Sequence, residues 1–157
     1  MKADKHEDFI RRGVVLHEDR QYGRALPFFE KALAECPTCP NAAYNLANTL
    51  YMLDDREPAR EILLQLVSSS DNTLRSGCVD LADSPRSLRL DGLILLFLAT
   101  LKATGSWKLA TPYLRRHLRQ RTRGLRSLWP KSEIVRDADE LRMSYSPRAT
   151  PVSEWNS

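Results

Sequence analysis

One pair of residues in this sequence has the spacing of a reactive or metal-binding site. Cys36 and Cys39 form a CxxC pair, and a third cysteine, Cys78, lies further along the chain. Thiolates at this spacing can ligate zinc or form a redox pair, but a zinc site needs four ligands, so Cys78 and a histidine would have to join them. Since Pro37 ends a helical pattern here, both cysteines can equally fill ordinary turn positions. We expect no cofactor and no metal, and keep Cys36 and Cys39 as the candidates for a metal or redox site.

A second group with chemical potential is a block of basic residues. Residues 92–132 carry nine Lys or Arg and no Asp or Glu, although the net charge of the chain is only +4. A solvated helix face usually mixes both signs, so segment 102–131 could bind an acidic partner or nucleic acid, or could simply be the solvated face of an amphipathic helix. Few aromatic residues accompany the arginines, which gives base stacking weak support. The candidate basic patch comprises Arg115, Arg116, Arg119, Arg123 and Arg126.

Patterns typical of enzymes and membrane proteins are missing from the sequence. It contains no Ser-His-Asp set, phosphate-binding loop, HExxH motif or dinucleotide fingerprint, so we expect a protein that is not an enzyme. The longest apolar run, Leu93 to Leu101, is about half of what a membrane span needs. The charged start of the chain has no apolar signal core, and three cysteines are an odd number. These features favour a cytoplasmic protein that does not enter membranes.

Apolar residues recur at helical spacing along most of the chain, and Leu outnumbers the β-branched residues, which predicts an all-α protein. Asn41 is the expected cap of the third helix. The residues from Ser68 to Asn72 interrupt the pattern, so we expect an irregular insert over 68–84. Proline residues favour a flexible tail over 144–157. The expected helices span residues 5–20, 22–35, 41–53, 57–67, 85–103, 107–121 and 132–143.

Two stretches of the chain repeat each other at a spacing of 34 residues. The aligned pairs are Gly13 with Ala47, Leu16 with Leu50, Ala25 with Ala59 and Phe29 with Leu63. A small residue where two helices cross lets their backbones approach, and a large residue nearby fills the remaining space. A period of this length indicates stacked helical hairpins, not one closed core.

The repeated pattern resembles that of the tetratricopeptide repeat family. It is clear over residues 5–71 and poor over 88–122, where Leu98 stands in the place of Gly13 and Ala47. The resemblance implies a right-handed stack of antiparallel helical hairpins in one domain, residues 1–143. It implies about three repeats, at 5–37, 39–71 and 85–122, the third degenerate, and then a capping helix at 132–143. The residues that carry the resemblance are Gly13, Tyr22, Ala25, Phe29, Ala32 and Pro37, then Tyr44, Asn45, Leu46, Ala47 and Ala59.

The same resemblance implies a protein–protein interaction module, or adaptor. In the family the first helix of each hairpin lines a concave groove that binds a peptide or a partner helix. The last helix or the 68–84 insert could instead fill that groove. Another protein or peptide is the expected partner, self-association through the Leu93–Leu101 helix is an additional route, and nucleic acid is less favoured. The groove residues implied by the alignment are Arg11, Val14, His17, Tyr44, Asn45, Asn48, Tyr51 and Leu96.

Overall fold

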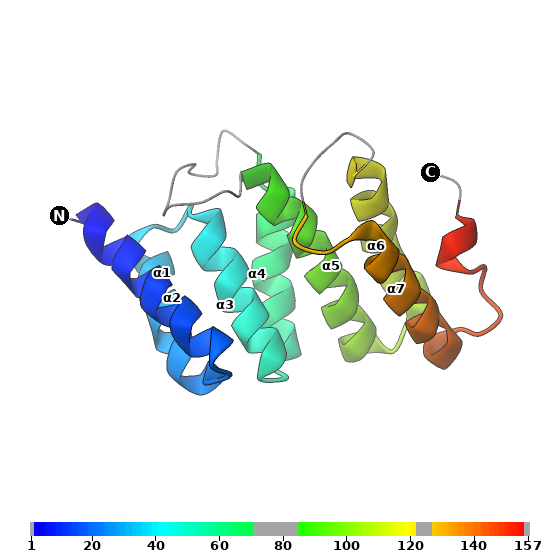
Figure 1. Cartoon of the computed structure of the whole chain (residues 1–157), viewed down its shortest axis with the longest axis horizontal. Coiled ribbons are helices and arrows are strands. Elements are labelled where there is room, and N and C mark those ends of the chain that lie inside the picture. Colours follow the sequence, from blue (N-terminus) through cyan, green and yellow to red (C-terminus); the bar gives the residue numbers. More distant parts are fainter. Residues whose placement is uncertain (1, 71–84, 122–126, 156–157) are drawn as a thin grey trace.

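The computed structural model describes residues 2–70, 85–121 and 127–155, and these ranges hold seven α-helices, one short 3₁₀ helix and no strand. The helices stand side by side in chain order, with α1 and α7 at opposite ends of the row (Figure 1). The expected all-α class is confirmed. The helices are α1 (Lys2–Glu18), α2 (Tyr22–Glu35), α3 (Pro40–Met52), α4 (Arg56–Ser68), α5 (Pro85–Thr104), α6 (Trp107–Arg121) and α7 (Lys131–Tyr145), followed by the 3₁₀ helix η1 (Val152–Glu154).

Consecutive helices pack against each other throughout the row. α1 with α2, α3 with α4 and α5 with α6 form three hairpins, and α2–α3 and α4–α5 contacts join one hairpin to the next. α1 also touches α3, and α3 touches α5, so the first helices of the hairpins are neighbours on one face. This face is called the inner face below. The stack of helical hairpins expected from the 34-residue spacing is therefore present, and α7 follows it as a single helix.

The first hairpin shows why a glycine is needed where its helices cross. A Cβ atom added to Gly13 of α1 would lie 2.6 Å from the ring of Phe29 in α2. Phe29 is fully buried, so its ring has little room to move aside. As expected from the sequence, the small residue at position 13 lets the backbone of α1 approach α2 closely.

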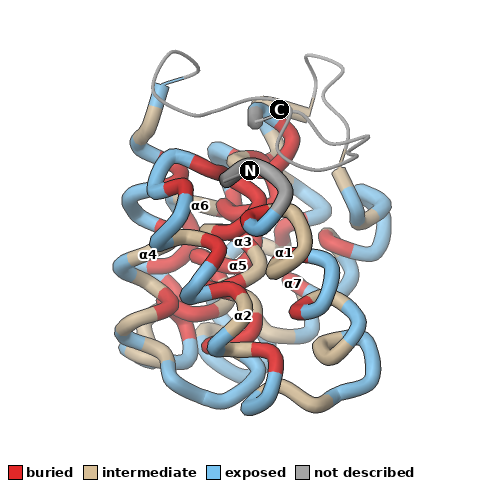
Figure 2. Tube along the Cα trace, turned by 90° about the vertical axis from the view of Figure 1, so that its left-hand side faces the viewer, coloured by how far each residue is buried: buried red, intermediate tan, exposed pale blue. Residues whose placement is uncertain are grey.

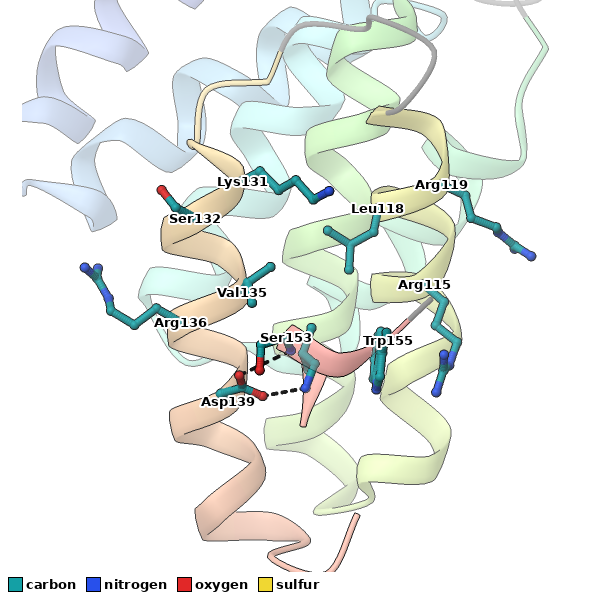
Figure 3. A pocket seen from close by; sticks show the side chains of 11 residues that line it. Arg115, Leu118, Arg119, Lys131, Ser132, Val135, Arg136, Asp139, Ser153 and Trp155 are labelled. Carbon is teal, nitrogen blue, oxygen red and sulfur yellow. Dashed lines mark hydrogen bonds between the residues drawn. The ribbon is translucent and has the colours of Figure 1, made fainter. Parts of the chain in front are cut away.

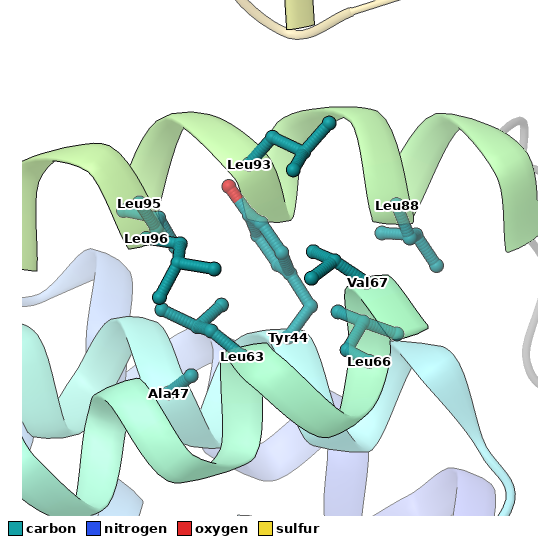
Figure 4. Close-up of a cluster of buried hydrophobic side chains, with 9 residues drawn as sticks. All are labelled: Tyr44, Ala47, Leu63, Leu66, Val67, Leu88, Leu93, Leu95 and Leu96. Atoms are coloured by element: carbon teal, nitrogen blue, oxygen red, sulfur yellow. The ribbon is translucent and has the colours of Figure 1, made fainter. Parts of the chain in front are cut away.

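Buried positions gather in the interior of the row, with exposed positions around it (Figure 2). One cluster joins α3, α4 and α5: Tyr44 points from α3 towards α5 and lies among leucines of α4 and α5, including Leu63, Leu93 and Leu96 (Figure 4). A second cluster joins α5, α6, α7 and η1. α5 contributes to both clusters because other helices cover it on every side.

The turn between the first two hairpins is closed by a cysteine. Cys39 precedes α3, and its Sγ accepts a hydrogen bond from the backbone N–H of Ala42 at 3.5 Å. Pro40 then takes the first helical position, where its missing N–H costs nothing. The expectation that Asn41 caps this helix is wrong, because the helix starts one residue earlier and Asn41 lies within it.

The end of the chain also differs from expectation. Residues 144–157 were expected to be a flexible tail, but α7 continues to Tyr145 and the segment 146–155 folds back onto the end of the stack. Buried Arg142 donates hydrogen bonds to the carbonyl oxygens of Pro147 and Ala149, at 2.9 and 3.0 Å. Val152 is only 3% exposed, so this segment covers apolar surface that α7 alone would leave open.

The other predicted irregular segment lies mostly outside the described residues. α4 ends at Ser68, and the structure describes the chain up to Ser70. The predicted insert from residue 71 to residue 84 is outside the described ranges, as is Cys78. In the part of the chain that is described, no helix is both long and apolar enough to cross a membrane.

Candidate protein-interaction surfaces

The structure divides the eight predicted groove residues into a buried and an accessible group. Tyr44 and Leu96 are 4% and 0% exposed and belong to the core between α3, α4 and α5. Their placement on an open groove wall is therefore wrong: these side chains face other helices of the same chain. The other six lie on α1 and α3 and are at least partly accessible.

Three of the accessible residues are joined by a hydrogen-bond chain that links α1 to α3. The Asn48 amide donates to His17 Nε2 at 3.4 Å, and His17 Nδ1 donates to the Thr49 hydroxyl at 3.0 Å. Thr49 in turn donates to the carbonyl oxygen of Asn45 at 2.8 Å. Burial lowers the pKa of His17, outweighing the opposite effect of Glu18, so the ring is neutral and can accept from Asn48. His17 therefore holds two helices in register, and its ring nitrogens are already engaged.

The remaining groove residues offer a mixed surface on two neighbouring helices. Arg11 keeps 58% of its side chain exposed while pairing with Glu7 at 3.6 Å, and Val14 is half-buried beside it on α1. On α3, the half-buried Tyr51 lies beneath the Lys102 ammonium group, 4.4 Å from the ring centre. Asn48 gives one amide hydrogen to His17, and among the described residues its side-chain oxygen has no hydrogen-bond partner.

The third hairpin contributes much less to the inner face, because the chain itself covers it. Asp91 of α5 accepts hydrogen bonds from the Ser127 hydroxyl and from the backbone N–H of Leu128. Trp129 packs against both clusters that contain α5, and α7 adds Ile134. The last helix, one of the two occupants considered from the sequence, packs against this part of the face, while most of the other, the 68–84 insert, lies outside the described residues. The Leu93–Leu101 stretch is buried apart from the half-buried Leu98, so the predicted self-association surface is not exposed.

The basic residues of α6 do not form one uniform patch. Arg115 and Arg119 are exposed, and the Arg115 guanidinium stacks on the Trp155 ring, 3.8 Å from its centre. Arg116 points the other way and donates to the carbonyl oxygen of Val67 in α4, at 3.3 Å. The candidates Arg123 and Arg126 lie outside the described residues.

Arg115 and Arg119 border a hollow at the C-terminal end of the stack, which we call the end hollow. It has a volume of about 720 Å³ and lies between α6, α7 and the segment that contains η1. Leu118 and Val135 point into it from opposite helices, and the Lys131 side chain reaches across from α7 towards α6 (Figure 3). The full lining is Arg115, Leu118, Arg119, Lys131, Ser132, Val135, Arg136, Asp139, Val152, Ser153 and Trp155.

Sequence reasoning found the α6 half of the end hollow and missed the other half. Lys131 belongs to the acid-free block, but it was not recognised as lying across the hollow from α6 (Figure 3). Trp155 and Val152 were assigned to a flexible tail. Two apolar residues in a short proline-containing segment were the available signal, since a disordered tail has little need of them.

The two cysteines are buried in the first interface between hairpins. Cys36 and Cys39 are 6% and 1% exposed and pack with Ile10, Ala32 and Ala42. Within the described ranges, no group of three or more His, Cys, Asp or Glu side chains is placed to hold a metal ion. Since Cys78 is not described, the metal and redox candidates remain a hypothesis that the structure does not strengthen.

These features together define a helical-repeat protein with accessible side chains on its inner face and a hollow at its C-terminal end. Residues 16–75 match the family model of the tetratricopeptide repeat. The segment 16–75 is therefore of the tetratricopeptide repeat type, and the resemblance drawn from the sequence is confirmed there. Searches of curated proteins and of solved structures found no match. Tetratricopeptide repeats are generally protein–protein interaction modules and typically act as non-enzymatic scaffolds.

Proposed function

We propose that this protein is an adaptor that binds a peptide or a helix of a partner protein on the inner face of its first two hairpins. The observation that carries the proposal is the joining of α1 and α3 by the His17 chain of hydrogen bonds. It fixes Asn48 beside His17, while Arg11 and Val14 lie on the adjoining face of α1. A rigid surface loses little conformational freedom when a partner binds, which favours affinity.

The side chains on this surface suit a polypeptide. The unengaged oxygen of Asn48 can accept a hydrogen bond from a peptide N–H, and Val14 offers a small apolar contact. Tyr51 offers a large contact area at low entropic cost, and aromatic residues of this kind often dominate binding energies. The exposed guanidinium of Arg11 adds a charged contact at the edge. The cytoplasmic location expected from the sequence remains a prediction.

The test is affinity capture from the native host with the full chain and matched variants. The variant Asn48→Ala removes a surface amide, and Tyr51→Ala removes the aromatic contact. Exposed Glu61 on α4 lies outside the proposed surface, so Glu61→Ala is the control. We expect a partner that the unaltered protein and the control retain, and that both inner-face variants lose by about tenfold in affinity when titrated in purified form.

Two results would count against the proposal. One is a set of captured proteins that does not differ between the inner-face variants and the control. The other is a partner that is lost only when the end hollow is altered. Because Tyr51 also contacts the core, melting curves of Tyr51→Ala must show a folded protein before its loss of binding is interpreted.

A further inference from the structure

The end hollow is separate from the inner face of α1 and α3 and lies at the opposite end of the row of helices. We propose that it is a second binding site, which takes an acidic peptide segment of a partner protein. The proposal does not depend on the inner face, since no residue of α1 or α3 lines the hollow.

Charge is the first argument for an acidic occupant. Four basic side chains and one carboxylate line the hollow. The carboxylate, Asp139, is already used: it accepts hydrogen bonds from the backbone N–H groups of Val152 and Ser153 and lies 3.7 Å from the Arg142 guanidinium. Its charge is therefore largely compensated within the chain, and the hollow as a whole is positive.

The positions of the basic groups strengthen this argument. The Lys131 side chain points into the hollow (Figure 3), and it forms no ion pair with any carboxylate in the described ranges. Arg115 lies at one side against Trp155, whereas Arg119, further along α6, extends away from α7 and contributes less (Figure 3). Arg136 has a partner of its own, Asp137 at 3.2 Å, so it contributes less. Carboxylates entering between α6 and α7 would meet positive charge from both helices.

The apolar lining selects a polypeptide over a bare phosphate or a nucleic acid. Leu118 and Val135 point into the hollow from α6 and α7 (Figure 3), and the buried Val152 also lines it. These groups gain nothing from a phosphate backbone but can bury a Leu-sized side chain. Among the described residues that line the hollow, Trp155 has the only aromatic ring. Arg115 already covers one face of this ring, which leaves little surface for bases to stack on.

The C-terminal segment shows that this end of the stack accepts a docked polypeptide. Residues 146–155 lie against α7 through hydrogen bonds of backbone groups to Asp139 and Arg142, with Val152 buried and Trp155 stacked on Arg115. The hollow is the remaining space between this segment and α6. An acidic peptide would therefore lie beside a segment that already uses the same kinds of contact.

The test uses the full chain and a fluorescein-labelled, glutamate-rich peptide containing one leucine. A peptide of the same length with glutamine in place of glutamate serves as the probe control. Fluorescence anisotropy should show binding of the glutamate peptide alone, with an affinity that falls between about 50 and about 300 mM NaCl. Lys131→Glu should weaken binding roughly tenfold at low salt, since it removes attractions and adds repulsion.

The matched control is Lys108→Glu on α6, which makes the same change in net charge at an exposed position outside the hollow. It should stay within about twofold of the unaltered protein. The variant Asn48→Ala should leave peptide binding unchanged, which separates this site from the inner face. Lys131 is exposed, so its substitution should leave the fold intact, and a far-ultraviolet circular dichroism spectrum of each variant is the check.

Three outcomes would overturn the proposal. The glutamate peptide could fail to bind at low salt. It could bind equally to Lys131→Glu and Lys108→Glu, which would make the effect one of net charge only. Duplex DNA could bind with the same dependence on Lys131 while the peptide does not, which would assign the basic block to nucleic acid.

Discussion

A fully buried histidine in the third hairpin should make this protein less stable in mild acid. His117 of α6 is 0% exposed. It is the eleventh residue from the start of its helix, where α2 has Ala32 and α4 has Leu66. The third repeat thus places an ionisable ring where the first two place apolar side chains.

The contacts of the ring fix its protonation state. The Nδ1 atom lies 2.8 Å from the carbonyl oxygen of Leu90, which can only accept, so Nδ1 carries a hydrogen. The Nε2 atom lies 3.4 Å from the Arg121 guanidinium, which can only donate, so Nε2 is the acceptor. A second proton on Nε2 would create a buried charge next to another cation. Burial, with a smaller contribution from Arg121, lowers the pKa of His117 from 6.5 to about 4, although the hydrogen bond to Leu90 acts in the opposite direction.

The magnitude follows from this shift. Between pH 6.5 and about pH 4 the unfolded chain binds a proton at this ring and the folded chain does not. Stability is therefore complete above pH 6.5 and falls as the pH drops through this window, by up to 1.4 kcal/mol per unit. Between pH 7 and pH 5, His117 should cost about 2 kcal/mol of the free energy of unfolding.

The assay is denaturant unfolding, followed by far-ultraviolet circular dichroism at a series of pH values, for the natural protein and for His117→Leu. The two proteins share all their other titrating groups. The difference between their free energies of unfolding therefore reports the contribution of His117 alone. We expect the difference in the free energy of unfolding to shift by about 2 kcal/mol in favour of the variant between pH 7 and pH 5. Parallel curves for the two proteins would refute the reasoning, and so would a shift that favours the natural protein.

Four further predictions concern other parts of the stack. Gly13→Ala should lower the free energy of unfolding by about 1–2 kcal/mol, because the clash with Phe29 exceeds the gain in helix propensity. Chemical denaturation measures this free energy. An unchanged or raised value would contradict the close approach of α1 and α2 at Gly13. Asp139→Asn should loosen the segment that contains Trp155 and lower the free energy of unfolding by about 1–2 kcal/mol. Thermal melting measures this loss, and limited proteolysis should cleave the variant faster near the C-terminus. An equal cleavage rate would show that the backbone hydrogen bonds to Asp139 do not hold the segment in place. Cys39→Ala should destabilise the chain by about 1 kcal/mol through loss of the α3 cap. Zinc analysis of the natural protein prepared without a histidine tag should find less than about a tenth of an equivalent, and stoichiometric zinc would instead revive the metal hypothesis for Cys36 and Cys39.

The contacts within the first two hairpins could be predicted from the sequence because they are set locally. Gly13 and Phe29 are close along the chain, and a small residue facing a large one at a helix crossing has only a few arrangements. The aligned Ala47 and Leu63 lie in the corresponding helices of the second hairpin. The contacts within each hairpin are therefore determined by that hairpin's own residues, and a period of 34 residues is sufficient to place α1 to α4.

The inner face of the third hairpin could not be predicted in the same way, because its environment is set by a distant segment. Alignment with the first two hairpins places Leu96 on an open wall. The structure closes that part of the fold with Trp129 and α7, and with bonds from Ser127 and Leu128 to Asp91. The apolar residues of α5 occur at nearly every position from 93 to 101, not on one stripe. This pattern is typical of a helix covered on all sides, and it was the sign that no open groove would continue there.

α7 covers the inner face of the third hairpin, and the same packing creates a new surface at the C-terminal end of the stack. Once α7 lies across the third hairpin, its far side and that of α6 form a new end to the stack. The segment 146–155 covers only part of this end, and the basic residues of α6 and α7 border the remainder. The acid-free composition of residues 92–132 fits this arrangement on the α6 side: a carboxylate on that wall would reduce the positive charge that distinguishes the end hollow from the inner face. An acidic peptide in the end hollow and a partner on the inner face could then bind at the two ends of the row independently, which would let this short stack bring two partners together.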